Sequence, residues 1–274
     1  MDEKECGIEE LERIPLQKNF IKRLVAVGFG TVYLGSLRND GMVAVKKLDA
    51  SRDVSDQQFL GEVKCLQTVN HKNIVRYLGY CAYTHDLVME MEKEVVMAGR
   101  AKRFLCFEYA PNGNLHDYLK EKTHGYEWSV RYKIIKGICQ GLRHLHQKGI
   151  IHLDLKPGNV LLGAQMEPKI TDFGLCDGTQ ISIVPSKVMG TLGYMPPELI
   201  NERKISFKSD IYSLGIIMIR LLTGINEDIP EKVRNIYNIF NCCDYIGNIV
   251  FMHVILSRND IVCYRTVLVN WGRL

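Results

Sequence analysis

The sequence lacks several features that would assign it to a particular class of proteins. None of its nine cysteines forms a C-x-x-C pair, so their spacing does not favour a metal site. The apolar run 214–222 is too short to span a membrane and contains Arg220, so no membrane span is expected. The N-terminal segment 1–15 is acidic and polar, unlike a signal peptide. These absences favour a cytoplasmic protein in a reducing compartment. The cysteines in apolar runs, which are expected to be buried free thiols, are Cys65, Cys81, Cys106 and Cys139.

The chain also has little net charge. A formal charge of +4 over 274 residues is too weak and too evenly spread to argue for a nucleic-acid partner, although it suits a phosphorylated small molecule. Apolar residues make up 46% and charged residues 24%, as in ordinary soluble globular proteins. The length is sufficient for one large domain or for two lobes that share a cleft.

The hydrophobic pattern changes character near residue 110. Residues 21–50 alternate short β-rich runs with turns, and the apolar residues of 55–69 have helical spacing. The pattern predicts further strands at 73–83 and 103–110, and helices at 114–122, 128–149 and 209–224. A β-rich first part followed by a helical second part predicts an α+β fold with two lobes and a hinge near Ala110–Asn114.

The stretch "LVAVGFGTVYLG", residues 24–35, is the first motif along the chain. It predicts a strand, a turn with Gly28 and Gly30, and a second strand. Taken alone, such a glycine signal is weak. A Rossmann-type dinucleotide enzyme is disfavoured, because that fold needs the glycines at a strand-to-helix turn.

The strongest motif is "IIHLDLKPGNVLL" at 150–162, which has the spacing H-x-D-x-K-x-x-N. It is followed by D-F-G at 172–174 and by "GTLGYMPPE" at 190–198, and it is preceded by Lys46 in "VAVKK" and by Glu62. Any one of these could occur by chance, but five in this order could not.

Together these motifs resemble those of eukaryotic protein kinases. The segments "HKNIVRYLGYC", "LCFEYAPNGNL" and "GLRHLHQKGIIHLDLKPGNVLL" are similar to those of plant receptor-like, and in particular receptor-like cytoplasmic, Ser/Thr kinases. The resemblance covers about residues 19–224 and implies a bilobal fold with a small β-rich N-lobe and a mainly helical C-lobe. The implied divisions are an N-terminal extension at 1–18, the N-lobe at 19–106, the hinge at 107–112, a partial C-lobe at 113–224 and a divergent tail at 225–274.

The resemblance assigns the acceptor chemistry to the catalytic loop. Asp154 would accept the proton of the substrate hydroxyl, and Lys156 would offset the charge of the γ-phosphate. Lys156 and Thr191 resemble the residues of Ser/Thr kinases rather than tyrosine kinases. Asp210 would anchor the backbone of the loop, a structural role. Candidate phosphorylation sites are Thr179, Ser182, Ser186 and Thr191.

The same resemblance places ATP and Mg²⁺ between the lobes. Asn159 and Asp172 would hold Mg²⁺, while Lys46 would contact the α- and β-phosphates and form an ion pair with Glu62. His152 and Phe173 are expected to pack rather than react. The implied ATP-site residues, some of which would also serve as ordinary core, are Leu24, Gly28, Gly30, Val32, Ala44, Lys46, Phe107, Glu108, Ala110, Leu161 and Asp172.

The chain departs from the family pattern in three places. Val25 and Val27 replace two glycines of the phosphate-covering loop, which predicts a flatter loop and slow turnover at best. Leu153 replaces an arginine that would meet a phosphorylated residue, which alters regulation rather than chemistry. The tail lacks the expected arginine partner of Glu198 and has no clear helical period, so 225–264 resembles an insertion or an altered reading of the gene.

Two functions therefore remain open. One is an ATP- and Mg²⁺-dependent kinase that phosphorylates Ser and Thr residues of proteins in plant-type signalling, downstream of a membrane receptor kinase. The other is a weak or inactive pseudokinase that serves as a binding or scaffold module. Neither involves nucleic acid, and both are expected in the cytoplasm or at a membrane through partners.

Overall fold

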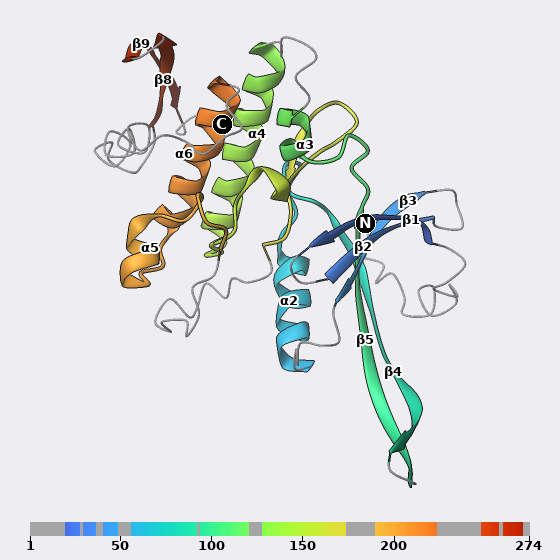
Figure 1. Cartoon of the computed structure of the whole chain (residues 1–274). Helices are drawn as coiled ribbons and strands as arrows, with labels where there is room; N and C mark the ends of the chain where they lie inside the picture. Colours follow the sequence, from blue (N-terminus) through green and yellow to red (C-terminus); the bar gives the residue numbers. More distant parts are fainter. Residues whose placement is uncertain are drawn as a thin grey trace.

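A computed structural model describes most of the chain as two lobes (Figure 1). The described residues are 20–27, 30–36, 41–48, 56–91, 94–120, 128–173, 190–223, 248–257 and 260–270. Strands dominate the first part and helices the second, which confirms the α+β bilobal prediction. None of the described helices has the length and apolar character needed to cross a membrane.

The N-lobe is an antiparallel sheet with one helix. Its strands follow the order β1-β2-β3-β5-β4. The elements are β1 (Phe20–Val27), β2 (Gly30–Ser36), β3 (Met42–Leu48), α2 (Asp56–Thr68), β4 (Tyr77–Met91) and β5 (Glu94–Glu108). The helix α2 confirms the prediction at 55–69, because Phe59, Val63 and Leu66 all point into the core and are buried.

The alternation along the strands divides the N-lobe core between the two faces of the sheet. Leu105 on β5 belongs to the main core, whereas its neighbours Phe104 and Cys106 pack with Val43 and Val45 of β3 in a second cluster. This is the period of two that a strand imposes on its side chains. The cysteine prediction holds for Cys81, Cys106 and Cys139, which are buried and free, whereas free Cys65 is half-buried.

The strands β4 and β5 are longer than the sequence pattern predicted. The expected strands ended near Tyr83 and began at Arg103, but the pairing continues from Gly79–Cys106 to Met91–Glu94. Figure 1 shows this two-stranded ribbon projecting well beyond the rest of the sheet. The other end of β5 runs to Glu108, so strand geometry extends into the expected hinge.

The C-lobe is organised around two long helices. Its elements are α3 (Leu115–Lys120), α4 (Trp128–Gln147), the short 3-10 turn Pro157–Asn159, β6 (Val160–Leu162), β7 (Pro168–Ile170), α5 (Pro197–Glu202) and α6 (Phe207–Thr223). Both α4 and α6 confirm predicted helices. Ile134, Ile138 and Ile217 are fully buried between them, and Arg131 donates a hydrogen bond to the carbonyl oxygen of Leu221 at 2.9 Å.

A loop at 69–76 joins the two lobes. Its Val75 amide donates to the carbonyl of Ile170 on β7, and the Ile170 amide donates back to the carbonyl of Asn73, both at 2.9 Å. The side-chain amide of Asn73 donates to the carbonyl of Pro168 at 2.9 Å. The segment between α2 and β4 is therefore tied directly to the C-lobe.

The tail contains one hairpin, β8 (Asn248–Ser257) paired with β9 (Asp260–Asn270). The sequence pattern assigned no structure there. Residues 224–247 and 271–274 lie outside the described part of the chain.

Candidate active site

The loop that carries Asp154 is held in place by one buried carboxylate. Asp210, on α6, is completely buried and accepts hydrogen bonds from the backbone amides of His152 at 2.8 Å and Leu153 at 2.9 Å. Its Oδ2 also lies 2.8 Å from Nε2 of His146. Leu153 has a φ of 62°, which side chains with a Cβ rarely adopt, and it packs against the core. The bonds to Asp210 thus hold a strained backbone immediately before Asp154.

His152 and Phe173 lie in the core, where the sequence analysis expected them to pack. The His152 ring is fully buried and meets the Phe173 ring edge to face, with 6.5 Å between centroids. Its Nε2 lies 3.0 Å from the carbonyl oxygen of Thr171, the residue before Asp172. The two rings connect the catalytic loop to the segment that carries Asp172.

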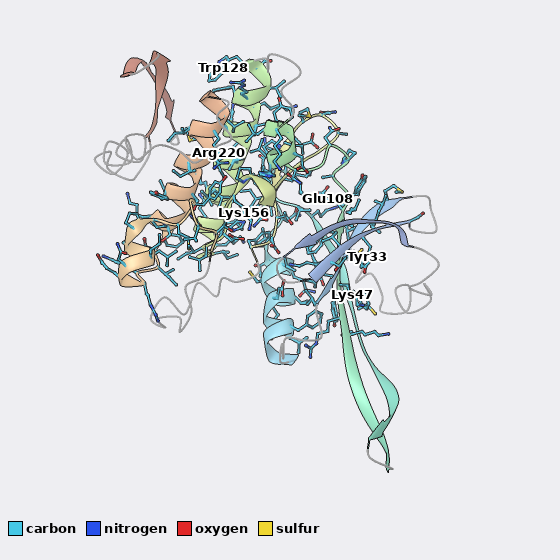
Figure 2. The ribbon with its side chains drawn as sticks, viewed as in Figure 1. Tyr33, Lys47, Glu108, Trp128, Lys156 and Arg220 are labelled. Atoms are coloured by element: carbon cyan, nitrogen blue, oxygen red, sulfur yellow. The ribbon has the colours of Figure 1, made fainter. Side chains whose placement is uncertain are left out.

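Asp154 lies at the centre of a hydrogen-bonded cluster. Nζ of Lys156 donates to its Oδ2 at 2.7 Å. The amide nitrogen of Asn159 donates to the Asp154 carbonyl at 2.9 Å and to Oδ2 at 3.1 Å. Figure 2 shows Lys156 on the side of the helical lobe that faces the sheet. The structure therefore brings together the three predicted residues of the H-x-D-x-K-x-x-N motif.

Thr191 completes this cluster. Its hydroxyl donates to Oδ1 of Asp154 at 2.6 Å and accepts from Nζ of Lys156 at 2.8 Å. The sequence analysis treated Thr191 as a candidate phosphorylation site and did not predict these contacts. The motif "GTLGY", which contains Thr191, is the sequence feature that could have indicated these contacts. The other candidate phosphorylation sites, Thr179, Ser182 and Ser186, lie outside the described residues.

Lys46 on β3 forms an ion pair with Asp172. Nζ lies 2.5 Å from Oδ1, and both side chains are largely buried. Burial alone would raise the pKa of Asp172, but the charge and hydrogen bond of Lys46, with the charges of His152 and Lys156, outweigh it and lower that pKa. Asp172 is therefore held as a carboxylate beside Lys46.

The expected ion pair between Lys46 and Glu62 is not formed. Among the described residues, the ion-pair partner of Lys46 is Asp172. Burial raises the pKa of Glu62, the charge of Lys46 lowers it, and the charge of Asp172 raises it further. The physical reason is competition, since two carboxylates face one ammonium group and Asp172 lies in direct contact with it.

Several predicted ATP-site residues are adjacent in the sheet. Val32 pairs with Lys46 across β2 and β3, and Ala44 pairs with Phe107 across β3 and β5. Leu161 lies on β6. These positions place Val32, Ala44 and Phe107 on neighbouring strands of the N-lobe sheet.

The remaining ATP-site positions are more varied. Leu24 is 37% exposed, Ala110 is buried, and Gly28 lies outside the described residues. A Cβ at Gly30 would collide with the carbonyl oxygen of Lys47, so only glycine fits there without rearrangement. The Glu108 amide donates to the Arg76 carbonyl at 3.0 Å, and Glu108 pairs with Val43 of β3.

The donor atoms near Asp154 suit Mg²⁺, which prefers oxygen ligands. Because the nitrogen of the Asn159 amide is engaged by Asp154, Oδ1 is the atom that remains to bind a cation. Asp172 supplies a charged carboxylate. The residue types and their orientation therefore fit the metal that the sequence analysis expected.

Comparison with known families matches a protein kinase domain to residues 22–239, past the boundary at 224 that the sequence suggested. The chain is 34% identical over 257 residues to the G-type lectin S-receptor-like serine/threonine-protein kinase RKS1 of Arabidopsis thaliana, covering 88% of this chain and 29% of that protein. It is 39% identical over 214 residues to the serine/threonine-protein kinase CDG1 of the same plant, covering 75% of this chain and 46% of that protein. The similarity to the cysteine-rich receptor-like protein kinase 24 is 36% over 228 residues, or 80% and 33% of the two chains. The chain thus spans less than half the length of these relatives.

Proposed function

The chain belongs to the protein kinase domain family, and on that basis we propose that it transfers the γ-phosphate of ATP to Ser and Thr hydroxyls of proteins. The observation that carries the proposal is the cluster around Asp154, in which a carboxylate, an ammonium group and a hydroxyl lie within hydrogen-bond distance of one another.

Asp154 is the group that receives the acceptor proton. Its Oδ1 faces a hydroxyl at 2.6 Å, which is the distance a general base needs. Lys156, bonded to both Asp154 and that hydroxyl, places a positive charge where a transferred phosphoryl group carries negative charge. Both residues act by position and charge.

Lys46, Asn159 and Asp172 form the nucleotide side of the site. Lys46 is the cation that would contact the α- and β-phosphates. Oxygen atoms of Asn159 and Asp172 would hold Mg²⁺, which would supply positive charge to offset that of the phosphates. Binding of the nucleotide and metal requires Lys46 to exchange its direct contact with Asp172 for contacts with phosphate.

A non-catalytic binding module is the second candidate. Two observations favour it. Lys46 pairs with Asp172 and not with Glu62, and β1 continues as paired strand through Val25 to Val27, which pairs with Gly30. A module of this kind would bind ATP without turning it over.

The decisive experiment compares the chain with Asp154→Asn in Mg·ATP. The assay measures phosphate transfer to casein, and a thermal melt measures ATP binding. The kinase proposal expects the substitution to lower transfer by roughly 10²-fold or more, the size of a general-base contribution, with the ATP-induced rise in Tm retained. If neither chain transfers phosphate to casein but ATP still raises the Tm of both, the binding module is favoured.

Protein partners follow from the same proposal. The substrates would be Ser- or Thr-containing proteins of plant-type signalling, and an upstream membrane receptor kinase would supply the signal in the cytoplasm. A pull-down from plant extract with the Asp154→Asn chain, followed by phosphorylation of the captured proteins by the wild-type chain, tests whether such substrates exist.

A further inference from the structure

The outward face of α4 carries basic residues and no acidic ones. Residues 128–153, which include the whole helix, contain no Asp or Glu, although the net charge of the full chain is only +4. This segment therefore concentrates positive charge. Its outward cations, which are exposed or half-buried, are Lys133, Lys136, Arg143 and Lys148.

The spacing of these cations gives the helix no compensation of its own. Lys133 and Lys136 are exposed and three residues apart, so they are neighbours on one face, where like charges destabilise a helix. The other positions three and four residues from Lys136, none of them acidic, are Tyr132, Cys139 and Gln140. The helix gains nothing from this row of like charges, whereas an anionic partner would be attracted by it.

Carboxylates of the neighbouring elements have contacts of their own. Glu167, in the turn between β6 and β7, accepts a hydrogen bond from the Gln165 amide at 2.9 Å. Glu108 forms an ion pair with Lys169 of β7 at 2.9 Å, so that pair adds no net charge. Nζ of Lys133 donates to the carbonyl oxygen of Gln165 at 2.6 Å, a neutral partner that leaves its charge in place.

Two aromatic residues continue the same face toward the start of α4. Trp128, Tyr132 and Lys136 follow one another at intervals of four residues, so they lie on one side of the helix. Trp128 is 45% exposed, and its ring centroid lies 6.4 Å from that of Tyr132. Figure 2 shows Trp128 at the end of the helical lobe that is remote from the sheet. Tryptophan and tyrosine beside basic residues are typical of surfaces that rest at lipid head groups.

We propose that this basic face of α4 docks on an anionic membrane surface. From Lys133 to Lys148 the row of cations extends about 22 Å at the rise of an α-helix. A convex row of this length fits a flat charged surface, whereas peptides are mostly held in grooves, at strand edges or by compact arginine clusters. The docking goes beyond the proposed kinase function and does not depend on it.

The test measures sedimentation of the full chain with lipid vesicles. We expect the chain to bind vesicles of equal parts phosphatidylserine and phosphatidylcholine, and to stay in solution with vesicles of phosphatidylcholine alone. Binding should weaken as sodium chloride is added, because salt shortens the range of the attraction between charges. The tryptophan fluorescence should shift to shorter wavelength on the anionic vesicles, and Trp128→Phe should lose this shift.

Variants separate this face from the net charge of the chain. Each cation at an anionic membrane surface strengthens binding by roughly fivefold, so Lys133→Gln with Lys136→Gln should weaken it roughly 25-fold. Lys133→Arg with Lys136→Arg keeps the charge and should bind as the wild type does. The matched control is Lys64→Gln with Lys204→Gln, which removes the same charge from exposed positions on α2 and after α5 and should bind almost normally.

Three results would overturn the proposal, and all of them are measured without ATP. Equal losses in the two glutamine pairs would mean that binding follows net charge and not this face. Equal binding to vesicles with and without phosphatidylserine would mean that the cations play no part. If the chain ignores anionic vesicles but binds polyglutamate through Lys133 and Lys136, the partner of this face is an acidic protein segment and not a membrane.

Discussion

At the scale of single residues, Asp210 determines where Asp154 lies. Its two carboxylate oxygens accept from two consecutive backbone amides and lie beside His146, with no exposure to solvent. Because Leu153 holds a positive φ next to these bonds, the loop would relax without them. The carboxylate of Asp154, which is proposed to act as the base, is thus positioned by a residue on another element, α6.

Replacing Asp210 with alanine should therefore destabilise the fold. The amides of His152 and Leu153 would be buried without an acceptor, and each such group costs about 1–3 kcal/mol. We expect the free energy of unfolding in urea to fall by roughly 2–5 kcal/mol. Asp210→Asn keeps one carbonyl acceptor, so its free energy of unfolding should fall clearly less than that of Asp210→Ala. An Asp210→Ala chain as stable as the wild type would show that the loop does not depend on these bonds.

The sequence predicted that Asp154, Lys156 and Asn159 lie together, as they do in the structure, but it did not predict all of their partners. The spacing of Asp154, Lys156 and Asn159 fixes them on one short loop, so their proximity follows from the sequence. The partner of Lys46 does not, because Glu62 and Asp172 are both carboxylates reached only through tertiary folding. The choice between them depends on how both segments pack around Lys46, which a local sequence pattern does not contain.

At the scale of elements, the fit of α4 against the loop at 69–76 depends on two glycines. A Cβ at Gly141 would lie 2.7 Å from the carbonyl oxygen of Asn73, and one at Gly137 would lie 2.6 Å from its side-chain nitrogen. Both distances are shorter than a carbon atom tolerates. The glycines allow α4 to approach the segment that connects the lobes.

Gly141→Ala should consequently weaken the contact between α4 and this loop. The atom nearest the added Cβ is the backbone carbonyl oxygen of Asn73, which cannot move aside easily. Overpacking of this kind lowers the free energy of unfolding by about 1–3 kcal/mol. Gly215→Ala on α6 is the matched control, since nothing lies within 4 Å of its added Cβ. There, alanine should stabilise the helix by about 0.5–1 kcal/mol. Urea unfolding should show changes of opposite sign, and equal changes would contradict the close approach.

The strand β1 offers a second prediction at this scale. Val25 pairs with Val32 and Val27 with Gly30, so strand pairing includes both positions at which the family pattern has glycine. Val25→Gly with Val27→Gly should loosen this end and raise kcat/KM for ATP, because backbone amides without a neighbouring Cβ approach phosphates more closely. Val25→Ala with Val27→Ala removes the branching but keeps the Cβ, and should give a smaller gain. If kcat/KM for ATP is unchanged in a folded double-glycine chain, these valines do not limit activity. The Lys46–Asp172 pair is then the next feature to test.

Element lengths were the least predictable part of the fold. The helices α2, α4 and α6 follow from apolar residues at helical spacing, because each has a face or a whole surface to bury. The ribbon of β4 and β5 extends beyond the predicted strands because cross-strand hydrogen bonds continue where no alternating apolar pattern marked a strand. Pairing between distant residues, rather than local pattern, sets where those strands end.

At the scale of the whole molecule, contacts near both ends of the loop at 69–76 join the two lobes. At one end, the side chain of Glu108, the last residue of β5, accepts hydrogen bonds from Nζ of Lys169 beside it on β7 at 2.9 Å and from the Arg76 amide at 2.8 Å. Figure 2 shows Glu108 where the chain passes from the sheet to the helical lobe. Near the other end of the loop, the ring of His71 stacks on the ring of His144 of α4, with 5.1 Å between ring centroids. These contacts combine residues far apart in the sequence, which is why the sequence predicted two lobes and a hinge but not the contacts that join the lobes.

The stacked histidines should make the stability of the molecule depend on pH. His71 Nδ1 accepts from the Asn73 amide at 3.1 Å, and His144 Nε2 is buried with no hydrogen-bond partner in the described structure. Burial lowers the pKa of both rings below 6.5; the charges of His144 and Lys72 add to this at His71, and that of Lys148 at His144.

Because these pKa values are lower in the folded state, the unfolded state binds more protons in acid. The contribution to stability is therefore fully present above about pH 6.5 and is lost as the pH falls toward the folded-state pKa values. His144→Phe keeps a stacked ring without a titrating group, so its free energy of unfolding should change less between about pH 7 and 5.5 than that of the wild type. His116→Phe, at an exposed position on α3, is the control and should keep the wild-type slope. Parallel pH profiles for the wild type and His144→Phe would mean that the junction between the lobes does not sense protons, and the acid sensitivity of the chain would then have to come from other groups.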